Sequence, residues 1–117
     1  MLLSEVLADY AGLPEYSGVK LVDVNQVSLF GDRPINIAAT RGSIAELQAL
    51  FLAGADINSP GEHGYTPLHN ATEQGALDAV KWLIENGADR GARNDLGWTA
   101  LDLATALGEV GLYELVS

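Results

Sequence analysis

The two histidines are the side chains of this chain best suited to acid–base catalysis or zinc binding near neutral pH. His63 and His69 would need a third ligand, such as a carboxylate, to form a zinc site. No H-E-x-x-H motif or comparable spacing supplies that ligand. The chain has no cysteine, which excludes thiolate zinc sites, disulfides and cysteine nucleophiles. We therefore expect no metal and no cofactor.

Other catalytic motifs are also missing. The chain has neither a G-x-x-x-x-G-K loop nor a G-x-G-x-x-G element, and no serine stands in a nucleophile-elbow motif beside a base. Ser43 and Thr66 fit better as helix caps. The sequence thus predicts a protein that is not an enzyme. The alternative, a small enzyme or a regulator of small-molecule chemistry, needs titratable groups that converge on a pocket, and the sequence supplies no such constellation.

Charge and length narrow the class of protein further. A chain of 117 residues predicts a single domain. Sixteen acidic and six basic residues give a net charge of −10, which repels nucleic-acid phosphates and anionic lipid surfaces. No apolar run approaches the roughly 18 residues of a membrane span, and the N-terminal residues lack the basic region of a signal peptide. We expect a cytoplasmic protein that binds neither nucleic acid nor membrane.

A period of 33 residues organises the chain. It relates two sets of three glycines and the two copies of a Gly-Ala-Asp tripeptide. Asp23-Val24-Asn25 lies one period before Asp56-Ile57-Asn58, so the end of a repeat already precedes the first full unit. The related positions are Gly31, Gly64 and Gly97; Gly42, Gly75 and Gly108; and Gly54-Ala55-Asp56 with Gly87-Ala88-Asp89.

Each unit carries two stretches with helical spacing of apolar residues. A short inner helix is marked by Leu68, Ala71 and Thr72 with counterparts Ile35, Ala38, Ala39 and Leu101, Ala104, Thr105. A second helix is marked by Ile44, Leu47, Leu50 and Phe51, then Leu77, Val80, Leu83 and Ile84, then Val110, Tyr113 and Val116. Ser43 to Glu46 has the spacing of a capping box, and Thr66-Pro67 supplies an N-cap followed by a first-turn proline.

The middle unit resembles the ankyrin repeat, because Thr66-Pro67-Leu68-His69-Asn70-Ala71 matches its T-P-L-H-x-A signature at the same period. The first and third units depart from it, with Arg33-Pro34-Ile35-Asn36 and Thr99-Ala100-Leu101-Asp102. The resemblance implies a mainly α ankyrin-repeat solenoid of stacked helix pairs joined by β-turn or hairpin connections. We expect residues 1–22 to form an N-terminal cap or degenerate half-repeat, with a helix over Leu2 to Tyr10, and residues 23–117 to hold three repeats.

The resemblance also gives a structural role to residues that otherwise suggest chemistry. His69 is expected to join the inner helix to neighbouring turns through hydrogen bonds with groups such as the Thr66 hydroxyl. Asp56 and Asp89 are expected to cap backbone N–H groups in their turns. The acids of the second helices are expected to form a solvated outer face; they include Glu46, Asp78, Glu85, Glu109 and Glu114.

Ankyrin-repeat proteins usually bind other proteins through their concave hairpin tips and the adjoining surface of the inner helices. Carried over by register, the predicted partner-binding residues are Leu29, Phe30, Asp32, Arg41, Glu62, His63, Tyr65, Glu73, Gln74, Asp95, Leu96 and Trp98, with Thr40, Ala106 and Leu107 on the adjoining helical surface. Exposed aromatic side chains are common at binding hot spots. The competing interpretation is that Phe30, Tyr65 and Trp98 pack against neighbouring turns and stiffen the hairpins. Trp82 is expected to pack between repeats or to be a lone exposed ring.

The predicted function is therefore a non-enzymatic protein–protein interaction module that is a monomer when unbound. The acidic charge favours a partner with a basic surface. A narrower hypothesis is an inhibitor or immunity-type protein that masks a basic enzyme, motivated by the small size and the strong acidic charge. A generic scaffold remains open beside it.

Overall fold

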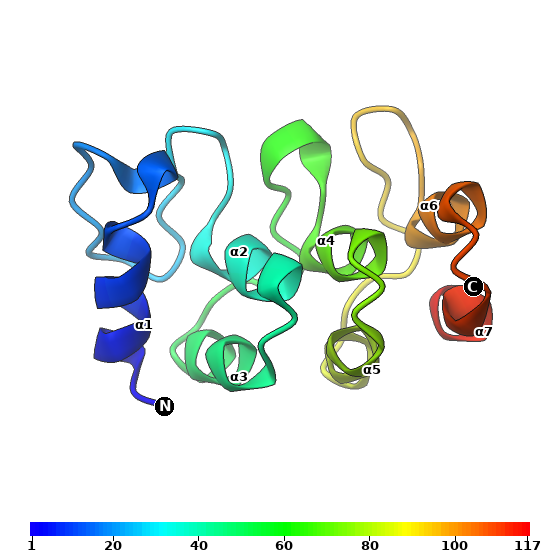
Figure 1. The fold of residues 1–117 in the computed structure, drawn as a ribbon, viewed down its shortest axis with the longest axis horizontal. Helices are drawn as coiled ribbons and strands as arrows, with labels where there is room; N and C mark the ends of the chain where they lie inside the picture. Colours follow the sequence, from blue (N-terminus) through cyan, green and yellow to red (C-terminus); the bar gives the residue numbers. More distant parts are fainter.

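The computed structural model describes residues 1–117 and contains seven α-helices and no β-strand. After an N-terminal helix, an inner row of three helices alternates along the chain with an outer row of three (Figure 1). Each inner helix packs on the next, α2 on α4 and α4 on α6. The helices are α1 (Leu3–Ala11), α2 (Pro34–Arg41), α3 (Ile44–Leu52), α4 (Pro67–Glu73), α5 (Leu77–Glu85), α6 (Ala100–Leu107) and α7 (Tyr113–Val116). Short 3₁₀ turns lie at Pro14–Tyr16, Glu62–Gly64 and Val110–Leu112.

The inner helices begin alike. In each one, the side chain of the third helical residue accepts a hydrogen bond from the backbone N–H of the residue that precedes the helix, which satisfies a donor that the helix itself leaves free. In α4 and α6 the preceding threonine hydroxyl also accepts from the third residue's N–H. The bonds run from Arg33 to Asn36 (2.9 Å), Thr66 to His69 (3.2 Å) and Thr99 to Asp102 (3.0 Å).

The capping box predicted at Ser43 is only half formed. The Ser43 hydroxyl accepts from the Glu46 N–H at 3.2 Å, as predicted. The Glu46 carboxylate does not return to Ser43; it accepts a hydrogen bond from the Tyr10 hydroxyl and lies 3.4 Å from the Arg41 guanidinium. The Glu46 side chain is only 13% exposed. The expectation of a solvated Glu46 is therefore wrong, because α1 packs on α3 and covers this part of the outer row.

The N-terminal segment contributes to the same core as the helix pairs. The predicted helix is confirmed as α1 within one residue at each end. Tyr10 and Tyr16 are completely buried, and the Tyr16 hydroxyl donates to the Gln26 carbonyl at 2.8 Å. Burial raises the pKa of both phenols. The division of the chain after residue 22 stays a prediction.

The third outer helix is shorter than predicted. Val110 was expected on its buried stripe but is 70% exposed, and the chain forms a 3₁₀ turn there before α7 begins at Tyr113. Leu112 and Val116 fill the inward positions. Leu112 and Val116 are four residues apart, which is the spacing of one face of an α-helix, so Val110 lies off this face.

The turns between helix pairs are joined by two asparagines one period apart. The Asn25 amide oxygen accepts from the Asp56 N–H at 3.0 Å, and the Asn58 amide oxygen accepts from the Asp89 N–H at 2.8 Å. Within each turn the aspartate caps a backbone N–H two residues on, as predicted for Asp56 and Asp89. Asp23 does the same for the Asn25 N–H at 2.7 Å. The turn before the first pair therefore has the geometry of the two later ones.

Candidate functional site

Three loops project from the same side of the inner row (Figure 1). We call them the first tip (residues 28–32), the second tip (residues 61–65) and the third tip (residues 94–98). A backbone hydrogen bond joins the first and last residues of each tip: the N–H of residue 28 donates to the carbonyl of residue 32 (2.7 Å), 61 to 65 (2.7 Å) and 94 to 98 (2.9 Å). The connections are thus tight turns without a strand ladder.

Neighbouring tips are fastened to one another. The Asp32 carboxylate accepts from the Glu62 N–H at 2.9 Å, and the His63 carbonyl accepts from the Asp95 N–H at 3.0 Å. The approach between the second and third tips requires glycine at position 64. A Cβ on Gly64 would lie 2.8 Å from the Asp95 backbone nitrogen, and its φ of +72° is a conformation that other residues rarely adopt. The three tips therefore form one continuous ridge.

His69 fastens the second inner helix to the third tip. Its Nδ1 accepts from the Thr66 N–H, so Nε2 carries the proton and donates to the Trp98 carbonyl at 2.8 Å. The side chain is buried, and burial lowers its pKa. One period earlier, the Asn36 amide donates to the Tyr65 carbonyl at 3.1 Å. The predicted hydrogen bonds of His69 are confirmed, and both of its ring nitrogens are occupied by them.

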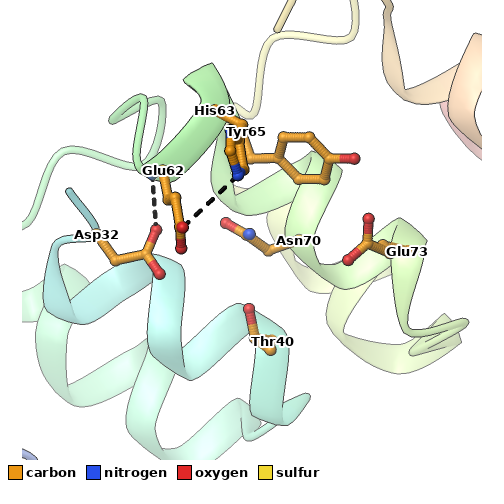
Figure 2. A pocket seen from close by; sticks show the side chains of 7 residues that line it. All are labelled: Asp32, Thr40, Glu62, His63, Tyr65, Asn70 and Glu73. Atoms are coloured by element: carbon orange, nitrogen blue, oxygen red, sulfur yellow. Dashed lines mark hydrogen bonds and ion pairs between the residues drawn. The ribbon is translucent and has the colours of Figure 1, made fainter. Parts of the chain in front are cut away.

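Below the second tip lies a polar hollow of about 240 Å³, which we call the acidic hollow. The side chains of Asp32, Glu62 and Asn70 point toward one another in it (Figure 2). The His63 imidazole is 3.6 Å from the Glu62 carboxylate. No lysine or arginine lines the hollow, whose residues are Asp32, Thr40, Glu62, His63, Tyr65, Asn70 and Glu73.

The carboxylates of this region destabilise one another's charged forms. Burial raises the pKa of Asp32, and the nearby Glu62 carboxylate adds to the rise, whereas the hydrogen bond from the Glu62 N–H opposes it. Burial also raises the pKa of Glu15, with further contributions from Asp32 and Glu62. Burial and the Glu73 carboxylate raise the pKa of the Tyr65 phenol. A cationic group placed here would relieve this repulsion.

A second hollow, of about 340 Å³, lies between the second and third tips and is lined by His63, Tyr65, Asn94, Asp95 and Leu96. A third, of about 220 Å³, shares Asp32 and Thr40 with the acidic hollow and is otherwise lined by Leu13, Glu15, Ile37 and Arg41. The hollows therefore follow one another along the tip side of the molecule. Eight of the predicted residues line at least one of them: Asp32, Arg41, Glu62, His63, Tyr65, Glu73, Asp95 and Leu96.

Large apolar side chains are exposed on the first and third tips but not on the second. Leu29 and Phe30 are 59% and 53% exposed, and Leu96 and Trp98 are 76% and 38% exposed. Tyr65 is partly buried and its ring lies against that of His69, with centroids 5.5 Å apart. The stiffening role weighed for the aromatics therefore fits Tyr65 better than Phe30.

Two further predicted residues have contacts of their own. Arg41 is held by the Asp9 carboxylate at 2.7 Å and stacks over the Tyr10 ring, so its charge is already partnered. Gln74 is exposed at the end of α4 and lines none of the hollows. Away from the tips, Trp82 packs edge to face on Phe51 with centroids 5.6 Å apart, which confirms the predicted packing between units.

Sequence reasoning did not include Glu15, Asn70 and Asn94 in the site. Asn70 and Asn94 fall in the repeat register beside predicted residues, so the period could have found them. Glu15 lies outside the repeats. It reaches the first tip because its carboxylate accepts from the Ser28 hydroxyl at 3.0 Å and its carbonyl accepts from the Leu29 N–H at 2.7 Å.

The structure contains no group of three or more histidine or acidic side chains arranged to hold a metal ion. None of its helices combines the length and apolar character needed to cross a membrane. The structure instead has a row of three tips, joined by hydrogen bonds, that carry apolar and acidic side chains.

The stacked helix pairs and their fastened tips define a helical-repeat solenoid. The family model for ankyrin repeats (many copies) matches residues 52–104, from the end of α3 into α6. Together with the signature of the second unit, this match identifies residues 52–104 as ankyrin repeats. Ankyrin repeats are generally protein–protein interaction modules. No curated protein sequence matches the chain significantly.

Proposed function

We propose that this protein binds a protein partner through its three tips and the hollows beside them. The observation that carries the proposal is the exposure of Phe30, Leu96 and Trp98 on tips that are fastened to one another. These side chains are not needed to close the tips, because backbone bonds do that. A preformed surface loses little conformational freedom on binding, which favours affinity.

The partner in this proposal has a basic surface. The chain carries a net charge of −10, and the acidic hollow has no lysine or arginine among its lining residues. Complementary charge speeds association and disfavours acidic competitors. The narrower form of the proposal is an inhibitor or immunity-type protein, a monomer when unbound, that masks a basic enzyme in the cytoplasm. A generic scaffold would use the same surface without blocking an active site.

Affinity capture identifies the partner and tests its chemistry. The protein is immobilised, incubated with a lysate of the cells that make it, and the bound proteins are identified by mass spectrometry. We expect one stoichiometric basic protein. A parallel capture with Phe30→Ala/Trp98→Ala should lose it, whereas Leu52→Ala should retain it, because Leu52 is 85% exposed on the outer row. Loss with Leu52→Ala alone would move the binding surface away from the tips.

Binding kinetics then separate anchors from steering charges. Trp98→Ala should weaken binding by about 2 kcal/mol, mainly through faster dissociation, if Trp98 is a desolvated anchor. Asp95→Asn should mainly slow association, and the effect should shrink at high salt. Tyr65→Ala should mainly lower the melting temperature, with only a small effect on the affinity of the folded protein, because its ring packs on His69. Full affinity in all three folded variants would contradict the proposal.

Inhibition distinguishes the narrower form from a scaffold. If the captured partner is an enzyme, its activity is measured with increasing amounts of the protein. We expect stoichiometric loss of activity that Phe30→Ala/Trp98→Ala does not produce. Full activity of the saturated complex would favour the scaffold.

A further inference from the structure

We propose that the partner carries a basic cluster flanked by two apolar side chains. The basic cluster binds the carboxylates around the second tip (Asp32, Glu62 and Asp95), and the apolar side chains bind the exposed apolar residues of the first and third tips. This inference rests on the proposed function, because it assigns a chemistry to each part of the same surface. It follows from the order of side chains along the three tips and from the groove between the second and third tips.

The apolar ends of the surface share one register, which holds Phe30 in the first tip and Leu96 in the third. At the first tip, Leu29 and Phe30 are both more than half exposed. At the third tip, Leu96 is 76% exposed and lines the groove toward Tyr65. At the second tip this register holds His63, and the register before it holds Leu29, Glu62 and Asp95 in the three tips. Exposed apolar side chains therefore lie at both ends of the surface, and none lies on the second tip.

The middle of the surface is complementary to cations. Glu62 and Asp32 face the acidic hollow together, and Asp95 borders the groove on the other side of the second tip. The arginines nearest the tips each donate to a backbone carbonyl, Arg33 to Pro60 at 3.0 Å and Arg93 to Gly97 at 2.7 Å, and neither lines the acidic hollow or the groove. An apolar partner without basic residues would leave these carboxylates desolvated and unpaired, which is unfavourable.

The fold also sets the separation of the two apolar ends. Packed helices lie about 8–10 Å apart, so tips that belong to α2 and α6 are separated by about 16–20 Å. An extended peptide covers this distance in about 5–6 residues, and a helix in about 11–13. The partner's two apolar side chains should therefore have one of these spacings in its sequence, with lysine or arginine between them.

A displayed library of random peptides of about 16 residues tests the inference, because this length allows either spacing. Peptides are selected on the immobilised full chain and then measured on four variants by titration calorimetry. We expect enriched sequences with two apolar residues at one of the two spacings and basic residues between them. Phe30→Ala and Leu96→Ala should each reduce affinity about tenfold, a difference of about 1.4 kcal/mol. Asp32→Asn/Glu62→Gln should reduce both affinity and its salt dependence, and Leu52→Ala should change nothing.

Three results would overturn the inference. Enriched peptides that depend on only one apolar tip, or that contain no basic residues between the apolar ones, would contradict the assignment while leaving the tips as the binding surface. Peptides insensitive to every tip variant would contradict the proposed function as well. A selection that enriches no sequence would also count against the predicted pattern.

Discussion

The second helix pair (α4 and α5) and the third (α6 and α7) begin with the same hydrogen-bonded capping box. Only in the second pair does a residue of this box also form a hydrogen bond with the neighbouring unit. His69 and Asp102 both accept from the N–H of the preceding threonine. The other nitrogen of His69 donates to the Trp98 carbonyl, whereas an ionised carboxylate has no proton to donate and Asp102 is exposed. The same repeat position therefore caps the inner helix in both units, and in the second unit it also joins that unit to the third.

Threonine shows the same contrast one helical turn further on. Thr72 is completely buried, and its hydroxyl has no hydrogen-bond partner. Thr105 is exposed and its hydroxyl donates to the Leu101 carbonyl at 2.8 Å. The difference teaches that the sequence register fixes what a residue does within its own unit, and that the neighbouring unit decides its burial and its remaining contacts.

Replacing His69 should have the largest effect. His69→Ala leaves the Trp98 carbonyl and the Thr66 N–H without a partner, and we expect a loss of about 2–3 kcal/mol in the free energy of unfolding, measured by urea denaturation. His69→Asn should recover much of the loss, because Asn36 makes both bonds in the first pair. Asp102→Ala should cost less than His69→Ala. An equal cost for the two alanine variants would contradict the contrast between the pairs.

Replacing Thr72 should stabilise the protein. Valine has nearly the same shape and removes a buried hydroxyl without a partner, so Thr72→Val should raise the free energy of unfolding by about 1 kcal/mol. Thr105→Val is the matched control, and we expect a change close to zero or a small loss, because it removes an exposed bond. Thermal and urea unfolding of both variants check the result. Destabilisation by Thr72→Val would mean that its hydroxyl has an unrecognised partner.

Asp32 extends the comparison to the first pair, where it occupies the register of Tyr65 and Trp98. Asp32→Asn keeps the acceptor for the Glu62 N–H and removes a partly buried charge beside Glu15 and Glu62. We expect unchanged or slightly higher stability, by less than about 1 kcal/mol, and slower association with a basic partner. Glu85→Gln on the outer row is the control for a charge change alone. Faster association of Asp32→Asn would be inconsistent with a basic partner.

The smallest expected effect is a pH dependence that comes from His69. Because burial lowers its pKa below that of the unfolded chain, the neutral imidazole is favoured in the folded state. Its contribution to stability should be complete above the unfolded pKa of about 6.5 and should be lost as the pH falls through the folded pKa. Unfolding of wild type and His69→Asn is compared at pH 7.5 and at lower pH. The wild type should lose more stability on acidification, and an identical loss in both proteins would exclude this role of His69.

The sequence by itself determined the period, the helix pairs and their local caps. Thr66, His69, Asp56 and Asp89 make the bonds that their motifs predict. These bonds join groups within three residues of one another, so the spacing of residue types is enough to predict them. The 33-residue period and the signature at Thr66 to Ala71 likewise predicted the ankyrin repeats, because both are patterns of residues close together along the chain.

Only the tertiary structure decided which side chains of equivalent register are buried, paired or exposed. Glu46 is covered by α1 through Tyr10, and Glu15 joins the first tip from outside the repeats. The partners in the first contact are 36 residues apart and do not follow the period. Burial and the loss of hydration depend on every group that packs nearby, and a repeated motif does not predict which distant residues pack on it.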